Sequence, residues 1–315
     1  MDFSGSSTSD SGLQMDPETA RHLFEGGAFL IALGVPPKTD FGIDLNSWRT
    51  GHKFMGVKMI PPGLHFIYYS AVSKENQMAP RSGFFHKFSR GEVLVRQWNP
   101  LTEALESALD PSSISSRDNL RNLDPHLGPY PYDSWKKWIS LTNKITDATL
   151  SRLEPSDGGV IHSVTQLVPE EFIMKSKGGR ALSQDELPDL KIKAGTNIRY
   201  TNIPSKYLQG ATPAELTRNS LDTSFQLESF LVDFNKLYGD QVSSSMTTHN
   251  HDNEVLAEVQ FSFICFLVGL HYDSFEHWKS LLIMLCTCDD ALSKYPELFF
   301  LSHHGYIFSN KGGPR

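Results

Sequence analysis

The sequence predicts an α+β protein, with a β-rich, sandwich-like N-terminal domain followed by an all-α C-terminal domain. Two observations lead to this prediction. Short apolar runs separated by Gly and Pro extend from Ala28 to about Trp98, which is typical of strands. Apolar residues at helical spacing take over near Pro100 and dominate from residue 211 onward. The chain has 315 residues, which is enough for two domains, each with its own core.

The first expected elements are a tail, a short helix and a strand. Residues 1–14 contain five serines and few apolar residues, which is typical of a disordered tail. Asp16 can cap a short helix that has Pro17 in its first turn, and Gly26-Gly27 ends this helix. The apolar run from Ala28 to Leu33 then predicts a buried strand.

Two strand pairs are expected next. Residues 57–60 and 64–69 flank Pro61-Pro62-Gly63, where proline followed by glycine suits a type II turn. Large apolar side chains occupy both faces of 64–69, so we expect both faces of this sheet to be covered. Residues 82–88 and 92–98 are expected to form a second hairpin across Ser89-Arg90-Gly91.

One helix is expected from Tyr132 to Leu153, because its apolar residues fall on one stripe: Trp135, Trp138, Ile139, Thr142 and Ile145. The lysines off that stripe, Lys136, Lys137 and Lys144, are interpreted as a solvated face rather than a phosphate site. Residues 175–189 are rich in Gly, Ser and charge, which predicts an exposed loop. Residues 197–200 are expected to return to the sheet as a short extended piece.

The C-terminal helices have clear signals. Thr212-Pro213-Ala214-Glu215 is a capping box with proline in the first helical position. The helix it opens shows apolar residues at Leu227, Leu231, Phe234 and Tyr238, and Gly239 closes it. A polar loop over 240–253 precedes an apolar helix over 255–270. Another helix opens at Asp273 and buries Phe275, Trp278, Leu281, Leu282 and Leu285.

These elements give the expected domain boundaries. Residues 1–14 form the tail, and residues 15–203 form the β-rich domain with helices near 112–153 and an exposed loop near 175–190. Residues 211–300 form the helical domain, and residues 301–315 form a separate tail.

Sequence motifs of the common enzyme mechanisms are absent. The chain has no phosphate-binding G-x-x-x-x-G-K-[ST], no dinucleotide G-x-G-x-x-G after a strand, no H-E-x-x-H and no G-x-S-x-G. A Ser/His/Asp or Cys/His hydrolase stays possible because such partners meet only in the fold. The residues favour a two-domain scaffold over a catalyst, so we assign no catalytic residue and no cofactor.

The best metal candidate is Cys286-x-Cys288 together with His271, His277, His303 and His304. Residues two apart on a helix diverge by about 200°, so the two thiols can share an ion only where the helix ends. The preferred interpretation places Cys286 in the core, and Cys288 and the histidines at the surface or at helix caps. His249-Asn250-His251 is interpreted as a solvated part of the polar loop. We therefore assign no metal ligand.

Charge and cysteine content bear on partners and compartment. The chain has 29 basic and 36 acidic residues and a net charge of −7, which argues against gripping nucleic-acid phosphates as its main task. Trp135-Lys136-Lys137-Trp138 could stack bases, but helical spacing favours core packing for the tryptophans. The three cysteines and the lack of a secretory signal predict an intracellular protein with reduced thiols. We expect no membrane partner and no small-molecule substrate.

Several segments together resemble the AAR-two family of cistron-splicing factors. The N-terminal ones are residues 41–48 (FGIDLNSW), 54–66 (FMGVKMIPPGLHF), 127–132 (LGPYPY) and 136–143 (KKWISLTN). The C-terminal ones are residues 210–215 (GATPAE) and 275–279 (FEHWK). The likeness runs from about Met15 to about Glu297, and segments of this length in the same order are highly specific.

The resemblance implies a non-enzymatic role. Proteins of this family are assembly chaperones of the U5 small nuclear ribonucleoprotein (snRNP). They bind the large core protein of this particle through the RNase H-like and MPN-type domains of that core protein. An RNA helicase later takes their place. The resemblance implies indirect association with the small nuclear RNA and residence in nucleus and cytoplasm. It also implies a β-rich domain, a linker and a VHS-like helical domain. Partner-contact residues are left unknown, as are phosphorylation sites and oligomeric state.

The end of the chain differs from this family. Residues 301–315 lack helical period and match nothing in it, so a C-terminally truncated form with an incomplete helical domain is expected. We expect the helix over 255–270 to lose packing partners and to leave an exposed apolar patch. Two alternatives to the chaperone stay open. One is a helical adaptor of VHS-like type that binds peptides or lipid headgroups, and the other is an enzyme with an unrecognised site.

Overall fold

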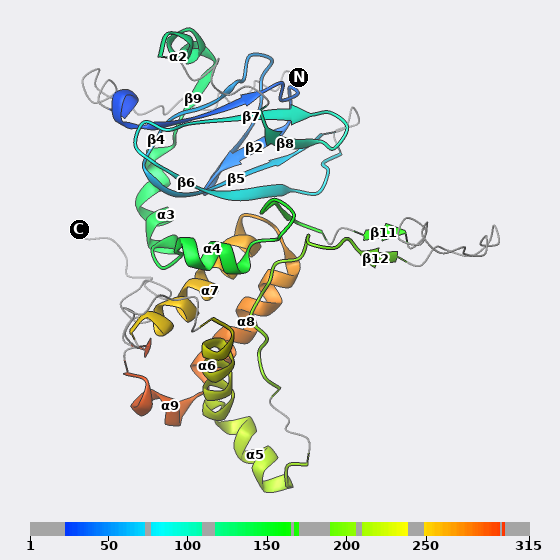
Figure 1. Cartoon of the computed structure of the whole chain (residues 1–315), viewed down its shortest axis with the longest axis vertical. Helices are drawn as coiled ribbons and strands as arrows, with labels where there is room; N and C mark the ends of the chain where they lie inside the picture. Colours follow the sequence, from blue (N-terminus) through cyan, green and yellow to red (C-terminus); the bar gives the residue numbers. More distant parts are fainter. Residues whose placement is uncertain are drawn as a thin grey trace, which may run out of the picture. The chain divides into compact units, whose positions relative to one another are not determined.

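A computed structural model describes residues 23–72, 77–108, 117–164, 167–169, 190–205, 210–238, 249–296 and 298–299. Two five-stranded sheets precede the helices α5 to α9 in these parts of the chain, which confirms the α+β class (Figure 1). The chain divides into two compact units. The first takes in residues up to 35, 52–63 and 87–130, and the second takes in 36–51, 64–86 and the chain from 131 onward.

Several sequence predictions lie outside the described residues. They include the tail at 1–14, the helix cap at Asp16, the exposed loop up to residue 189, the helix end at Gly239 and the tail at 301–315.

The first unit contains a sheet in the order β8-β7-β1-β4-β9. These strands are β8 (Ala104–Ser107), β7 (Val93–Asn99), β1 (Ala28–Leu33), β4 (Gly56–Ile60) and β9 (Leu127–Pro129). The central strand β1 runs parallel to β7 and antiparallel to β4, and its first five residues are buried as its apolar run predicts. Gly56 is required at the β1–β4 pair, because a Cβ there would overlap the carbonyl oxygen of Leu30.

The apolar core of this unit lies between its sheet and α2 (Arg117–Leu123). It is formed by Phe29, Ile31, Val95, Leu120 and Leu127. A short 3₁₀ helix, η1 (Asp124–His126), links α2 to β9, and Lys58 Nζ lies 2.7 Å from Asp124 Oδ1. This ion pair joins β4 to the segment that leads into its parallel neighbour β9.

The second unit contains a sheet in the order β10-β6-β5-β2-β3. Its strands are β10 (Ile161–His162), β6 (Ser82–Phe88), β5 (Gly63–Ser70), β2 (Asp40–Ile43) and β3 (Asn46–Arg49). Strand β2 is antiparallel to both β3 and β5. All of Phe66 to Tyr69 in β5 are buried, which confirms the prediction that both faces of this segment are covered. Gly42 of β2 leaves room for the ring of Tyr68, which a Cβ would overlap.

The predicted pairing of these strands is wrong, although their positions are right. Strands β4 and β5 belong to different sheets, and so do β6 and β7. Gly63 and Gly91 do adopt positive φ, as the turn residues predict, but each connection leads from one sheet into the other. Residues 197–200 form no strand either. They run in extended form along the helices described below.

The helix expected over 132–153 is interrupted. It consists of η2 (Tyr132–Ser134), α3 (Trp135–Thr142) and α4 (Asp147–Leu153). Thr146 starts α4 anew, because it and Thr149 form a reciprocal capping box. Trp138 and Thr142 are buried as predicted, whereas Ile139 is 44% exposed. Lys136 and Lys137 are exposed as expected, but Lys144 is half-buried and binds α7.

The C-terminal helices are α5 (Pro213–Leu221), α6 (Ser224–Tyr238), α7 (His249–Leu267), α8 (Tyr272–Cys286) and α9 (Asp289–Lys294). Thr212 forms the predicted capping box with Glu215. The chain breaks after α5 because Asp222 accepts hydrogen bonds from the backbone and hydroxyl of Ser224. The predicted polar loop at 240–253 ends earlier than expected. His249, Asn250 and His251 belong to the first turn of α7. This turn is polar, so the spacing of apolar residues did not predict it as helix.

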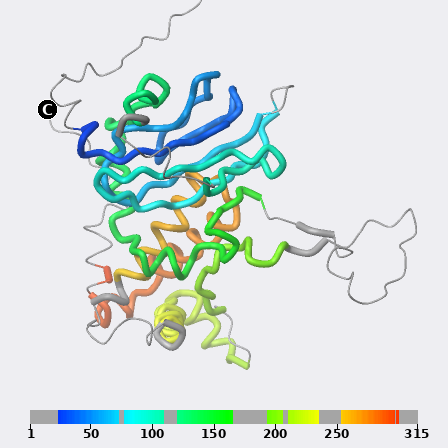
Figure 2. The backbone as a smooth tube through the Cα atoms, turned by 45° about the horizontal axis from the view of Figure 1, so that its top comes forward, coloured from blue at the N-terminus to red at the C-terminus, as the bar shows by residue number. Residues whose placement is uncertain are grey.

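Helices α3, α4 and α7 cover one face of the second sheet (Figures 1 and 2). Phe66 and Phe85 from the sheet pack with Trp138, Phe261 and Ile264 from the helices. A second core joins α6, α7, α8 and α9. Of the segment 255–270, for which an exposed apolar patch is expected, Val255, Phe261, Ile264 and Cys265 are fully buried, whereas Leu267 and Leu270 are 43% and 53% exposed.

Strands β11 (Leu167–Pro169) and β12 (Leu190–Ile192) form a separate two-stranded antiparallel sheet. Among the described helices, none has both the length and the apolar composition that a membrane crossing requires.

Candidate functional site

The helical part of the second unit carries an open hollow of about 720 Å³ beside the extended segment 200–205. That segment forms one wall, and α8 forms the other through Asp273, Glu276, His277, Ser280 and Ile283. Gln226 of α6 closes one side, and its amide nitrogen donates to the carbonyl of Pro204. The lining combines carboxylates with apolar side chains, of which Ile283 is 41% exposed. We call this hollow the linker groove.

Beneath the linker groove lies the fully buried carboxylate of Glu258 in α7. Its Oε2 lies 2.5 Å from Arg152 Nη1 of α4, and its Oε1 lies 2.9 Å from His277 Nε2 of α8. Thr201 donates twice to it, from the backbone nitrogen at 2.8 Å and from the hydroxyl at 2.8 Å. One carboxylate therefore joins two helices and the extended segment to α7.

The contacts of Glu258 set its protonation. Burial alone would raise the pKa of the Glu258 carboxyl, since it disfavours the charged form. The hydrogen bond from His277 and the charge of Arg152 outweigh burial and lower this pKa to about 2. Glu258 is therefore ionised at neutral pH, and its negative charge balances the guanidinium of Arg152, which is itself only 6% exposed.

We call Glu258 and its partners Arg152, His277 and Thr201 the Glu258 centre. Tyr200 lies next to this centre and contacts two residues of α8. Its ring stacks on the imidazole of His277 with centroids 4.0 Å apart and planes 17° apart. Its hydroxyl donates to Ser274 Oγ at 2.6 Å. The Ser274 backbone nitrogen donates in turn to His271 Nδ1, which caps α8. Tyr200 thereby fixes the extended segment on the first turns of α8.

A row of polar side chains on α7 attaches it to α3 and α4. Gln260 Oε1 accepts from the backbone nitrogen of Lys144 at 2.8 Å, and its amide donates to Asn143 Oδ1 at 2.9 Å. Glu254 accepts from the hydroxyls of Thr146 and Thr149 at 2.9 and 3.0 Å. These contacts align α7 by hydrogen bonds as well as by apolar packing.

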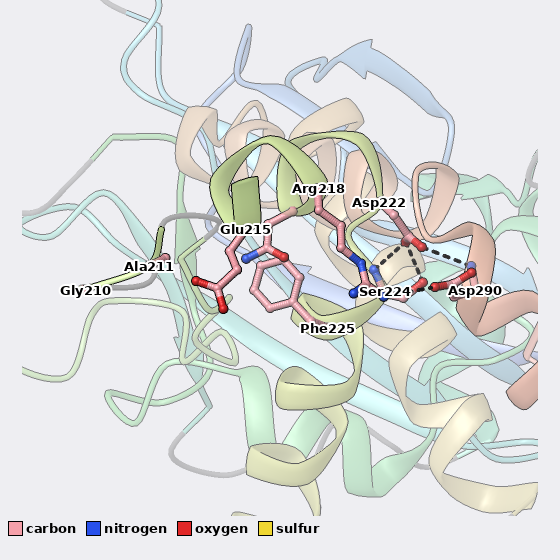
Figure 3. A pocket seen from close by; sticks show the side chains of 9 residues that line it. Gly210, Ala211, Glu215, Arg218, Asp222, Ser224, Phe225 and Asp290 are labelled. Carbon is pink, nitrogen blue, oxygen red and sulfur yellow. Dashed lines mark hydrogen bonds and ion pairs between the residues drawn. The ribbon is translucent and has the colours of Figure 1, made fainter. Parts of the chain in front are cut away.

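A second hollow, of about 560 Å³, lies where α5, α6 and α9 meet (Figure 3). Asp222 and Ser224 line this hollow, and Ser224 Oγ accepts a hydrogen bond from the backbone nitrogen of Ala291 at 2.9 Å. Arg218 lies 4.0 Å from Asp290, and both side chains are largely exposed. Glu215 points away from this pair toward Ala211 (Figure 3). We call this hollow the α5 pocket.

The candidate metal residues do not come together. Within the described residues no group of three His, Cys, Asp or Glu side chains is arranged to hold a metal ion. The predicted burial of two cysteines is reversed, because Cys286 is exposed and Cys288 is buried. Cys288 follows the end of α8, where the chain turns inward. His271 is a helix cap as expected, but His277 lies inside the Glu258 centre rather than on the surface. His303 and His304 lie outside the described residues.

The sequence pattern alone does not identify Glu258, Arg152 and Tyr200 as a group. A charged residue within the apolar run of α7 was the available signal, since a buried carboxylate requires a partner. Its partners lie in α4 and α8, far from it in sequence, so spacing alone could not identify them.

Comparisons with known proteins give consistent results over most of the chain. Residues 26–155 match the family model described as the AAR2 N-terminal domain, and residues 200–302 match the AAR2 C-terminal repeat region. The chain is 42% identical to the Protein AAR2 homolog of Mus musculus over 308 residues, covering 92% of this chain and 77% of that protein. It is 42% identical to the Homo sapiens homolog over 306 residues, covering 91% and 76%. Identity to the Caenorhabditis elegans homolog is 34% over 307 residues, covering 90% and 79%.

Proposed function

This chain belongs to the AAR2 family, and from that membership we propose that it is a pre-mRNA splicing factor that acts as an assembly chaperone. In this role it holds the large core protein of the U5 snRNP through the RNase H-like and MPN-type domains of that protein. The supporting observation is the match of both family regions in order, with 42% identity over 92% of the chain. The proposed role is non-enzymatic, and it places the protein in nucleus and cytoplasm, where precursor particles are assembled.

The linker groove supports a protein partner. It is open and lined by an extended segment, an exposed apolar side chain at Ile283 and the carboxylates of Asp273 and Glu276. Protein interfaces combine apolar contacts with polar groups at the rim in this way. We propose that a segment of the core protein binds here, on a wall that the Glu258 centre keeps rigid.

The charge of the chain supports indirect contact with RNA. A net charge of −7 disfavours a direct grip on phosphates, because such a grip releases counterions from a basic face. In the proposed role the chain reaches the small nuclear RNA only through the core protein. The same charge suits a basic surface on the protein partner.

Binding of the purified chain to the isolated RNase H-like and MPN-type domains tests the proposal. We expect Ile283→Asp to weaken binding to at least one of these domains by more than tenfold. Val232→Asp is the matched control, because Val232 is 50% exposed on α6 and does not line the groove. Circular dichroism checks that both variants fold.

The outcomes separate the function from the site. If the unmodified chain binds neither domain, the chaperone proposal is wrong. Equal binding by both variants would keep the function and reject the linker groove. Binding of unrelated peptides or lipid vesicles with similar affinity would favour the helical-adaptor alternative instead.

A further inference from the structure

Thr212-Pro213 is the only place in the chain where a proline follows a serine or threonine. Proline-directed protein kinases select a hydroxyl residue followed by proline and bind the substrate as extended chain. Thr212 already has extended backbone angles, with φ −69° and ψ 158°, and its side chain is exposed. Proline has no backbone N–H to leave unpaired in such a complex. Both the sequence and the local conformation at Thr212 therefore suit this class of enzyme.

The surroundings of Thr212 allow it to enter an enzyme cleft. Helix α5 has nine residues, none of them buried, and lies at the end of the second unit away from its sheet (Figure 1). Isolated helices of this length are only marginally stable in water, so opening the first turn costs little. This turn is held by the capping box and by two hydrogen bonds, from the Leu216 backbone nitrogen to the Thr212 carbonyl and from the Thr217 hydroxyl to the Pro213 carbonyl.

We propose that Thr212 is a phosphorylation site for a proline-directed kinase, with ATP as the phosphoryl donor. Thr212 Oγ1 attacks the γ-phosphorus and forms the new P–O bond. The bond from that phosphorus to the β,γ-bridging oxygen breaks, and ADP leaves. The hydroxyl proton passes to the carboxylate base of the kinase.

The capping box determines what the phosphate changes. In the unmodified chain Thr212 Oγ1 donates to Glu215 Oε2 at 2.9 Å, and the Thr212 backbone nitrogen donates to the same oxygen at 2.7 Å. The phosphothreonine ester oxygen has no proton to donate, and the group carries a charge of about −1.5 to −2 at neutral pH. It repels the Glu215 carboxylate, which must leave the cap.

Among the residues that line the α5 pocket, the cationic one is Arg218. It lines the α5 pocket together with Glu215, and it lies on the same helix (Figure 3). Its ion pair with Asp290 is long, at 4.0 Å, and exposed, so little energy holds it there. The phosphate draws Arg218 away from Asp290 and loosens the contact between α5 and α9. Phosphorylation thus exchanges one set of contacts around the α5 pocket for another.

The first test treats the full chain with a purified cyclin-dependent kinase and ATP and maps the phosphate by mass spectrometry. We expect the phosphate on Thr212. We also expect the initial rate of phosphorylation to be at least tenfold lower for Pro213→Ala, a variant that keeps Thr212 and in which alanine favours the helix. Thr217, exposed on the same helix without a following proline, serves as an internal control and stays unmodified. No phosphate on Thr212, or an equal rate for Pro213→Ala, would overturn the assignment.

The second test measures the phosphate itself. Titration of the phosphorylated chain by ³¹P NMR gives the second pKa of the group, which is about 6 when unperturbed. Contact with Arg218 favours the dianion, so we expect a lower pKa that rises when Arg218→Gln is introduced. Arg121→Gln, in the first unit, is the control and leaves it unchanged. A pKa that is indifferent to Arg218→Gln would reject the rearrangement around the α5 pocket.

Discussion

The carboxylate of Glu258 and the guanidinium of Arg152 lie 2.5 Å apart in the interior of the second unit, and together they connect α7 to α4. Neither side chain is more than 6% exposed. Two charges at this depth require each other, because either one alone would be buried without compensation. His277 and Thr201 bind the same carboxylate, so four separate parts of the chain depend on it.

Replacing Glu258 by alanine should strongly destabilise the second unit. The variant leaves Arg152 buried beside a cavity, and breaking such a pair costs about 3–5 kcal/mol. Urea unfolding followed by fluorescence measures the loss. The double variant Arg152→Met, Glu258→Leu should lose less, because no unpaired charge remains. A loss below about 1 kcal/mol for Glu258→Ala would show that the pair contributes little.

The same carboxylate should make stability depend on acid. Its folded pKa of about 2 lies below the model-peptide value of 4.5, so the unfolded chain binds the proton first as pH falls. The stabilising contribution is complete above pH 4.5 and is lost as pH falls toward 2. Thermal unfolding at pH 5 and pH 3 should show a larger drop in Tm for the unmodified chain than for Glu258→Gln. An equal drop in both would contradict this assignment.

Glu154 should have the opposite effect at higher pH. Burial raises the pKa of its carboxyl from 4.5 to about 7, and the charge of Arg199 opposes this rise only in part. Between these values the unfolded chain loses its proton first, so stability falls as pH rises from 4.5 to 7. Glu154→Gln has no proton to lose. Its free energy of unfolding relative to the unmodified chain should therefore be higher at pH 8 than at pH 5 in urea titrations, and a difference independent of pH would refute the prediction.

Gln260 should be required for the attachment of α7 to α3. Gln260→Ala leaves the backbone nitrogen of Lys144 without its acceptor, at an expected cost of about 1–3 kcal/mol. Gln260→Glu keeps that acceptor but removes the amide donor to Asn143, so its loss should be smaller. Hydrogen exchange at Lys144 distinguishes the two variants, since only Gln260→Ala should speed it. Gln97→Ala, at an exposed position in the first unit, is the control.

Thiol labelling should distinguish the three cysteines. Cys286 is exposed, whereas Cys265 and Cys288 are buried. Burial raises the pKa of Cys265 well above its usual value and that of Cys288 to about 11, so both stay protonated and unreactive at pH 8. Iodoacetamide should therefore modify Cys286 first in the folded chain, and Cys286→Ser should abolish the fast phase. Fast labelling of Cys288 would contradict the described burial.

Local signals in the sequence were sufficient for single elements. The apolar run of β1 and the capping box at Thr212 were identified where the structure has them, because both depend on adjacent residues. Pairing between strands could not be identified in this way. Strands β6 and β7 have nearly the predicted limits, yet β7 pairs with β1, and no turn residue at 89–91 encodes that choice.

The candidate site was harder to predict for a related reason. Glu258 is a charged residue in the apolar run of α7, but its partners come from α4, α8 and the segment at 201, which the local sequence pattern does not indicate. The burial of side chains at a helix end could not be predicted from local sequence either. Cys286 is exposed and Cys288 is buried, the reverse of the prediction, because α8 ends between them. Such outcomes depend on the tertiary fold rather than on local pattern.

The interleaved strands have a consequence for synthesis on the ribosome. The chain supplies β1 to one sheet, β2 and β3 to the other, β4 to the first and β5 and β6 to the second before it returns with β7. The nascent polypeptide cannot complete the first sheet before β9 has emerged, nor the second before β10. Contacts between such distant segments slow folding. Apolar strands such as β1 therefore stay unpaired until their partner strands have been synthesised. During that interval the nascent chain is most prone to aggregation.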